Sequence, residues 1–262
     1  MIFATGVAGW ALAAVHVPTL GEFYLLRMGL NAAACQAGAV GLMYLALEPF
    51  VRRIWPEALI SWMRLVSGRF RDPLVASHVL VGISAGLAFI LLRMLTAWGT
   101  GTLLGAPGNG ASVGNARFLT SNLLLDLWLC AFLSVGYVLV LVMMRRVARR
   151  TWVADALFVV LLSALLAPLA SADGATYLAV GPWILWFAAI TWVLRRFGLL
   201  AVAAAVYASY LTMGLPLPVA SSYAAVSLAT PLLIAAVAAW SLYAVLASRP
   251  GTASRSAAEP LV

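Results

Sequence analysis

The feature that most constrains this chain is a succession of apolar runs, each close to the roughly 20 residues that a helix needs to cross a bilayer. Eight runs can be separated, at about residues 2–17, 23–47, 78–98, 121–144, 152–170, 177–194, 197–215 and 223–247. Of the 262 residues, 65% are hydrophobic and only 9% are charged, which is more apolar than a soluble domain needs to be. The sequence therefore predicts an all-α fold, a polytopic membrane helical bundle of about eight transmembrane helices.

A single transmembrane domain is expected over residues 1–248, followed by a flexible cytoplasmic tail at residues 249–262. Within this domain the chain turns polar over residues 50–77. Residues 99–115 are rich in glycine and predict a flexible external loop. No Gly-Lys-Ser or Gly-Lys-Thr follows these glycines, so they do not indicate a phosphate-binding loop.

The arginines determine the expected orientation, because the cytoplasmic loops of membrane proteins carry an excess of positive charge. All sixteen basic residues are arginine, and the net charge is +8. Thirteen of them fall on one side of the predicted spans: Arg52, Arg53, Arg64, Arg69, Arg71, Arg145, Arg146, Arg149, Arg150, Arg195, Arg196, Arg249 and Arg255. Only Arg27, Arg93 and Arg117 fall on the other side or at its margin. The distribution places both termini in the cytoplasm, and it attributes the positive charge to membrane topology rather than to nucleic acid binding.

An amphipathic helix is predicted within the polar segment, from about Trp55 to Gly68. Apolar residues recur there at three- and four-residue steps: Leu59, Ile60, Met63, Val66 and Phe70. Pro56 suits the first turn of a helix, and Gly68 suits its end. We expect this helix to lie along the cytoplasmic lipid headgroups, with an ordinary solvated loop as the alternative. Its expected interfacial anchors are Trp55, Trp62, Arg64, Arg69 and Arg71.

Two charged residues fall inside predicted spans. Arg93 lies five residues before Trp98, where its span ends, and Asp126 lies five residues after Ser121, where the next span begins. Both charges are therefore expected at a similar depth, about 7.5 Å from the ends of their spans. Because an isolated charge within a membrane helix is costly, Arg93 and Asp126 are a candidate structural ion pair. The alternative is that each side chain reaches headgroups or water by itself.

Several sequence blocks carry a resemblance to a known family. They read Glu48-Pro49-Phe50-Val51-Arg52-Arg53, Trp55-Pro56, Gly68-Arg69-Phe70-Arg71-Asp72-Pro73-Leu74-Val75 and Arg196-Phe197-Gly198-Leu199-Leu200. Together they resemble the C-terminal membrane region behind the catalytic domain of bacterial, especially acidobacterial, serine/threonine protein kinases. The chain departs from that pattern at Ala76-Ser77-His78, where a Gly and an Arg-Asp pair are expected. The resemblance covers most of the chain and implies a multi-pass protein of the bacterial inner (cytoplasmic) membrane.

The kinase motifs themselves are absent from the sequence. It contains no His-Arg-Asp, no Asp-Phe-Gly and no Val-Ala-Ile-Lys, which supply the base, metal and phosphate contacts of phosphoryl transfer. We therefore expect a non-catalytic membrane anchor or sensor module without cofactor or metal, either cut from a longer kinase or as a freestanding paralogue. The expected partners are the lipid bilayer and a kinase domain in cis or trans, or a second copy of the chain.

A small-solute transporter or channel is the alternative function. Polar residues in or near the predicted spans favour it: Asp126, Arg93, His16 and Gln36. The two halves of the chain show no convincing inverted repeat, which many transporters have. An intramembrane enzyme is less favoured, because its catalytic groups must meet at one depth, and the two histidines, His16 and His78, are predicted near opposite faces.

Overall fold

The computed structural model describes residues 1–14, 16, 20–100, 116–148, 150–170, 180–213 and 224–248, and every regular element among them is helical. The elements are α1 (Ile2–Ala13), α2 (Gly21–Ile54), the 3₁₀ turn η1 (Pro56–Leu59), α3 (Ile60–Val66), α4 (Pro73–Thr100), α6 (Ala116–Val147), α7 (Thr151–Ala170), α8 (Val180–Phe197), α9 (Leu199–Met213) and α10 (Ala224–Ala247). In its described part, each predicted apolar run overlaps one helix. The all-α prediction is therefore confirmed for the described residues.

Within the described residues, four helices are long and apolar enough to cross a membrane: Gly21–Arg53, Pro73–Gly99, Ala116–Val147 and Leu228–Ala247. Three further apolar segments are shorter: Ile2–Ala13, Thr151–Leu166 and Leu199–Met213. At 1.5 Å per residue, the 15 residues of α9 reach about 22 Å, whereas the hydrocarbon core of a bilayer measures about 30 Å. The apolar helices are thus compatible with a membrane-embedded protein, and four of them have the full crossing length.

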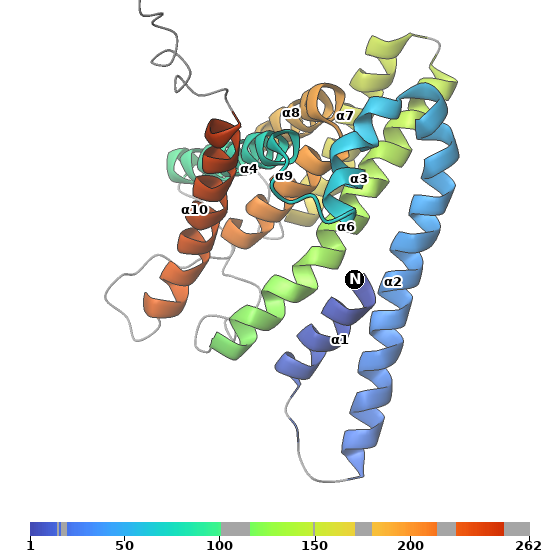
Figure 1. Cartoon of the computed structure of the whole chain (residues 1–262). Helices are drawn as coiled ribbons and strands as arrows, with labels where there is room; N and C mark the ends of the chain where they lie inside the picture. The colour runs from blue at the N-terminus through green and yellow to red at the C-terminus, as the bar shows by residue number, and fades with distance from the viewer. Residues whose placement is uncertain are drawn as a thin grey trace, which may run out of the picture.

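The helices pack in two groups that meet where α6 contacts both α7 and α9, and Figure 1 shows their arrangement. In the first group, α1 lies against both α2 and α6. In the second, α4 packs along α9 and α10, and α8 contacts α4, α7 and α9. Long helices that follow one another in the chain are therefore not always neighbours, since α4 and α6 each pack along α9.

Small residues bring α1 close to its neighbours, as is common where helices meet in lipid. The buried Ser121 hydroxyl of α6 donates a hydrogen bond to the Gly9 carbonyl oxygen of α1 at 2.6 Å. The Trp10 ring lies on Gly29 of α2, where an added Cβ would come within 2.2 Å of it. At the end of α1, Arg117 donates hydrogen bonds to main-chain carbonyl oxygens, which satisfies acceptors that a helix C-terminus leaves open.

Aromatic side chains fill the core between α4, α6, α7 and α8. Tyr137, Phe158 and Phe187 meet edge to face, with ring centroids 5.7 to 6.2 Å apart. Phe89 of α4 stacks on Trp186 of α8 at 4.3 Å. Such pairs contribute about 0.5–1.5 kcal/mol each beyond the burial of their surface. This cluster holds the four helices together below the charged residues at their ends.

The predicted amphipathic helix forms in two pieces, η1 and α3. Pro56 occupies the first turn of η1. Gly68 has a φ of +82°, a left-handed conformation that commonly follows a helix end. The predicted external loop lies outside the described residues from position 101 onward, and its first two residues continue α4. The predicted tail at 249–262 also lies outside them.

Candidate functional site

Arginines that the sequence assigns to the cytoplasm gather at one end of the helical bundle. We define this arginine-rich end as residues 48–73, 144–148, 150–155 and 195–199. It combines the ends of α2, α6 and α8, the starts of α4, α7 and α9, and the whole of η1 and α3. The Arg146 guanidinium lies 5.0 Å from the ring centroid of Phe50 and thereby joins α6 to α2.

The centre of this end is an ion-pair node around Asp155. Its carboxylate accepts hydrogen bonds from Arg195 at 2.7 Å and from Arg145 at 3.4 Å. The Arg145 guanidinium also lies 4.7 Å from the Trp55 ring centroid, within the range of a cation–π interaction. The Asp155 and Arg145 side chains are only 16% and 15% exposed. One carboxylate therefore ties α6, α7 and α8 together, and Trp55 connects them to the end of α2.

Replacing Asp155 with asparagine is expected to lower the free energy of unfolding by about 1–3 kcal/mol, because the substitution leaves the largely buried Arg145 side chain without its counter-charge. Thermal unfolding in detergent micelles measures the change. The matched control is Glu48→Gln, which breaks the exposed i,i+4 pair of Glu48 with Arg52 and should cost about 0–1 kcal/mol. Equal losses in the two variants would contradict the conclusion that the ion pairs of Asp155 hold the helices together.

Gly198 allows the turn between α8 and α9 to pack directly against η1. Its φ is +83°, and its N–H donates to the Leu194 carbonyl oxygen at 3.0 Å to close α8. A Cβ at this position would lie 2.4 Å from the Ala58 carbonyl oxygen. Ala58 is 2% exposed, so the main chains of η1 and of the turn are in direct contact. η1 and the turn between α8 and α9, which are far apart in the chain, thus meet at this point.

Asp72 caps the N-terminus of α4. Its carboxylate accepts a hydrogen bond from the Leu74 N–H at 2.9 Å, which satisfies an open donor of the helix N-terminus. Pro73 follows as the first helical residue, where its missing N–H has no cost. The other carboxylate oxygen accepts from Arg64 of α3 at 2.7 Å. The Arg-Asp-Pro sequence therefore starts α4 and holds α3 against it.

The pKa of Asp72 lies below its ordinary value. Burial by itself would raise this pKa, but hydrogen bonds from the Leu74 N–H and from Arg64 outweigh the burial and favour the charged form. A carboxyl whose pKa is lower in the folded state stabilises the fold above the unfolded-state pKa. That contribution is lost as the pH falls through the folded-state pKa.

The stability difference between the wild-type protein and Asp72→Asn should therefore shrink as the pH falls from 6 through about 4, the ordinary pKa range of aspartate. Asparagine can still cap α4, so the variant isolates the loss of the ion pair with Arg64. Thermal unfolding midpoints of both proteins, recorded at steps of pH, measure the difference. A difference that stays constant down to pH 3 would contradict the assigned role of the carboxylate.

The five predicted interfacial anchors lie in different environments. Trp55 and Trp62 are partly buried and pack against the hydrophobic core. The Arg64 side chain is held by its ion pair. Arg69 and Arg71 are exposed. The tryptophans thus fix η1 and α3 to the bundle, while the last two arginines are available to the surroundings.

The predicted apolar stripe also divides between two faces. Leu59 is buried, at 5% exposure. Ile60, Met63, Val66 and Phe70 are exposed, at 43%, 43%, 62% and 58%. A row of exposed apolar side chains therefore runs along α3 beside the exposed arginines.

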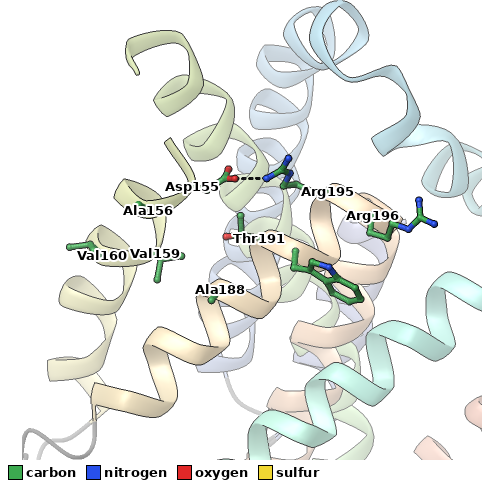
Figure 2. Close-up of a pocket in the computed structure, with 9 residues that line it drawn as sticks. Asp155, Ala156, Val159, Val160, Ala188, Thr191, Arg195 and Arg196 are labelled. Atoms are coloured by element: carbon green, nitrogen blue, oxygen red, sulfur yellow. Dashed lines mark hydrogen bonds and ion pairs between the residues drawn. The ribbon is translucent and has the colours of Figure 1, made fainter. Parts of the chain in front are cut away.

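An open groove with a volume of about 690 Å³ lies between α7 and α8 at this end (Figure 2). Along its length it is lined mainly by apolar side chains, from alanine and valine to the large ring of Trp192, with the hydroxyl of Thr191 among them. Its end is charged, with Asp155, Arg195 and Arg196. Figure 2 shows Arg195 directed at Asp155 and Arg196 pointing away from it. An apolar groove that ends in guanidinium groups suits an amphiphile with a negatively charged headgroup.

The structure does not bring Arg93 and Asp126 together. Arg93 of α4 lies over the Trp183 ring of α8, 5.6 Å from its centroid. Asp126 of α6 lies within electrostatic reach of Tyr207 of α9, whose hydroxyl donates to the Leu123 carbonyl oxygen at 3.0 Å. The predicted pairing required α4 and α6 to lie side by side, whereas both pack along α9.

Among the described residues, no group of three or more His, Cys, Asp and Glu side chains could hold a metal ion. No protein-family model matches the chain, and searches of curated proteins and of solved structures found no match either. The arrangement of the arginine-rich end is therefore the main basis for a functional proposal.

Sequence reasoning missed Asp155, Gly198 and the groove beside them. Asp155 is an acidic residue in the first turns of an apolar run, between the arginine clusters at the ends of the runs before and after it. That placement predicts a counter-ion for one of the clusters. The role of Gly198 depends on the approach of Ala58, 140 residues earlier in the chain, and no local pattern indicates it.

Proposed function

We propose that this chain is the non-catalytic membrane module of a bacterial signalling protein, serving as its anchor in the inner membrane and as its sensor. The contact of η1 with the α8–α9 turn, through Ala58 and Gly198, carries the proposal. It joins segments that are distant in the chain, and Gly198 belongs to one of the blocks that resemble the membrane region of serine/threonine kinases. Since these segments build one interlocked end of the bundle, a domain attached at the cytoplasmic side would sense changes in helix packing.

We further propose that all eight apolar helices cross the inner membrane, with both termini in the cytoplasm. The direction of the helices at the arginine-rich end supports this topology, because α2, α6 and α8 end there while α4, α7 and α9 begin there. Such alternation is expected of a chain that crosses repeatedly. The exposed row on α3, with Arg69 and Arg71, would then contact the cytoplasmic headgroups.

Reporter fusions test the proposed topology. Alkaline phosphatase, which folds to an active enzyme outside the cytoplasm, should be active when fused at Asn109 and inactive when fused at Arg255. A fluorescent protein that folds in the cytoplasm should give the opposite pattern at the same two positions. Activity of the phosphatase at Arg255 would refute the orientation.

A fractionation experiment tests the role as an anchor. A soluble kinase domain fused ahead of Met1 should remain with the membrane after an alkaline carbonate wash, and the unfused domain should be released. A sensor that transmits changes in helix packing should also change the phosphorylation rate of the fused domain when Asp155→Asn weakens the ion pairs with Arg145 and Arg195. A fused domain that washes off would refute anchoring, and an unchanged phosphorylation rate would refute sensing through this end.

A small-solute transporter is the second candidate, and Asp126 is the observation that favours it. Its carboxylate lies within a long apolar helix and has no ion pair among the described residues, as expected of a functional intramembrane charge. His16 supports it less, since it pairs with Glu22 of α2. Proton flux into dye-loaded proteoliposomes that Asp126→Asn abolishes would favour the transporter, whereas the anchor predicts no flux.

A further inference from the structure

The groove between α7 and α8 combines an apolar wall with unneutralised positive charge. Arg145, Asp155, Arg195 and Arg196 stand at its end or directly behind it, and three guanidinium groups with one carboxylate give them a net charge of +2. Asp155 already accepts from two of these arginines. Arg196 forms no ion pair with any residue that the structure describes. Its exposed side chain points away from Asp155 (Figure 2), so it can turn toward an anion in the groove without breaking the ion pairs of Asp155.

The remainder of the groove is suited to a hydrocarbon chain. Val159, Val160 and Ala188 line it, and Ala188 precedes Arg195 by seven residues, or about 10 Å along α8. The large ring of Trp192 also lines it and is 60% exposed. Leu157 and Leu185 of the same two helices are exposed as well, at 47% and 57%. An acyl chain in the groove would therefore extend directly into surrounding lipid.

We propose that this groove binds one anionic phospholipid of the cytoplasmic leaflet, with the phosphate at Arg195 and Arg196 and one acyl chain along Val160 and Ala188. The proposal rests on the placement of the arginine-rich end at that leaflet. Basic pockets between transmembrane helices on the cytoplasmic side suit such headgroups. The bound lipid would bridge α7 and α8 next to the Asp155 node, which gives the proposed sensor a chemical class of ligand.

Native mass spectrometry of the purified chain, with phosphatidylglycerol or phosphatidylethanolamine added to the detergent, tests the proposal. The wild-type protein should retain one phosphatidylglycerol molecule in preference to phosphatidylethanolamine. Arg196→Gln should weaken that binding about tenfold, the effect of losing one charge-assisted contact. The matched control is Arg53→Gln, which removes an exposed arginine of the same end that does not line the groove, and it should leave binding unchanged.

A second pair of variants tests the acyl-chain wall. Ala188→Phe should block the groove and weaken phosphatidylglycerol binding. Ala189→Phe should not, because Ala189 is also exposed on α8 but does not line the groove. Inorganic phosphate should fail to displace the bound lipid, since it offers no acyl chain.

Four outcomes would overturn the proposal: equal binding of both lipids, equal losses in Arg196→Gln and Arg53→Gln, full displacement by phosphate, or a dimer in place of a lipid adduct. Failure of the proposed function would be recognised separately. The reporter fusions would then give the reversed orientation, whatever the lipid measurements show.

Discussion

Replacing Gly198 with alanine is expected to destabilise the folded chain far more than replacing Gly68 with alanine. Both glycines have a left-handed main chain, with φ of +83° and +82°, which costs a residue with a Cβ about 1–2 kcal/mol. Their surroundings differ. A Cβ on Gly198 would lie 2.4 Å from the Ala58 carbonyl oxygen, whereas a Cβ on Gly68 would have no neighbour within 4 Å.

The difference between the two variants therefore isolates the contact of η1 with the α8–α9 turn. Inserting a methyl group into a closely packed contact costs about 1–3 kcal/mol, and this cost applies only at Gly198. Thermal unfolding in detergent should show a small loss in the free energy of unfolding for Gly68→Ala. The loss for Gly198→Ala should be roughly two- to fourfold larger, in proportion to these energies. Equal losses would mean that η1 can move away without cost. The proposal that η1 and the α8–α9 turn are tightly packed at this end would then be wrong.

The helices could be predicted from the sequence because apolar runs of this length have few stable alternatives in lipid. A membrane span must satisfy its own main-chain hydrogen bonds, which a helix does within each segment. Pro56 and Gly68 act through equally local constraints. Pro56 begins η1 and Gly68 follows the end of α3, as the sequence indicates. Local chemistry thus determines which residues are helical.

The contacts between helices could not be predicted in the same way. The Arg93 and Asp126 pairing relied on helix order in the chain, but α4 packs along α9 rather than along α6. In lipid, no burial of apolar surface from water selects neighbours, so close fit and hydrogen bonds decide. The stripe on α3 divides for the same reason: its periodicity predicts a helix, yet the fit of Leu59 into the bundle decides which residues remain exposed.

One sequence signal does report a helix neighbour. Gly82-Ile83-Ser84-Ala85-Gly86 is a Gly-x-x-x-Gly motif, which in membrane helices favours close approach of a partner with small residues. In the structure the motif faces the alanine-rich side of α9. Figure 1 shows α4 and α9 next to each other. The motif indicates that a close neighbour exists, but only the fold identifies it as α9.

Replacing Gly82 with alanine is expected to lower the free energy of unfolding by about 1–3 kcal/mol, and Gly82→Leu should prevent α4 from packing on α9 at all. A Cβ on Gly82 would lie 2.3 Å from the Ala201 carbonyl oxygen, and one on Gly86 would lie 2.4 Å from the Ala205 carbonyl oxygen. Both obstacles are main-chain atoms, so no side-chain rotation relieves them. Gly86→Ala should therefore have a loss of similar size.

The decisive control is the same substitution at a helical glycine with open space. Gly38 and Gly41 of α2 have no atom within 4 Å of an added Cβ. Alanine there should stabilise the chain by about 0.5–1 kcal/mol, because it restricts the unfolded chain and favours the helix. Thermal unfolding in detergent should thus show that the same Gly→Ala substitution destabilises the chain in α4 and stabilises it in α2. If Gly82→Ala were as harmless as Gly38→Ala, the close contact of α4 with α9 would be wrong, and with it the packing that separates α4 from α6.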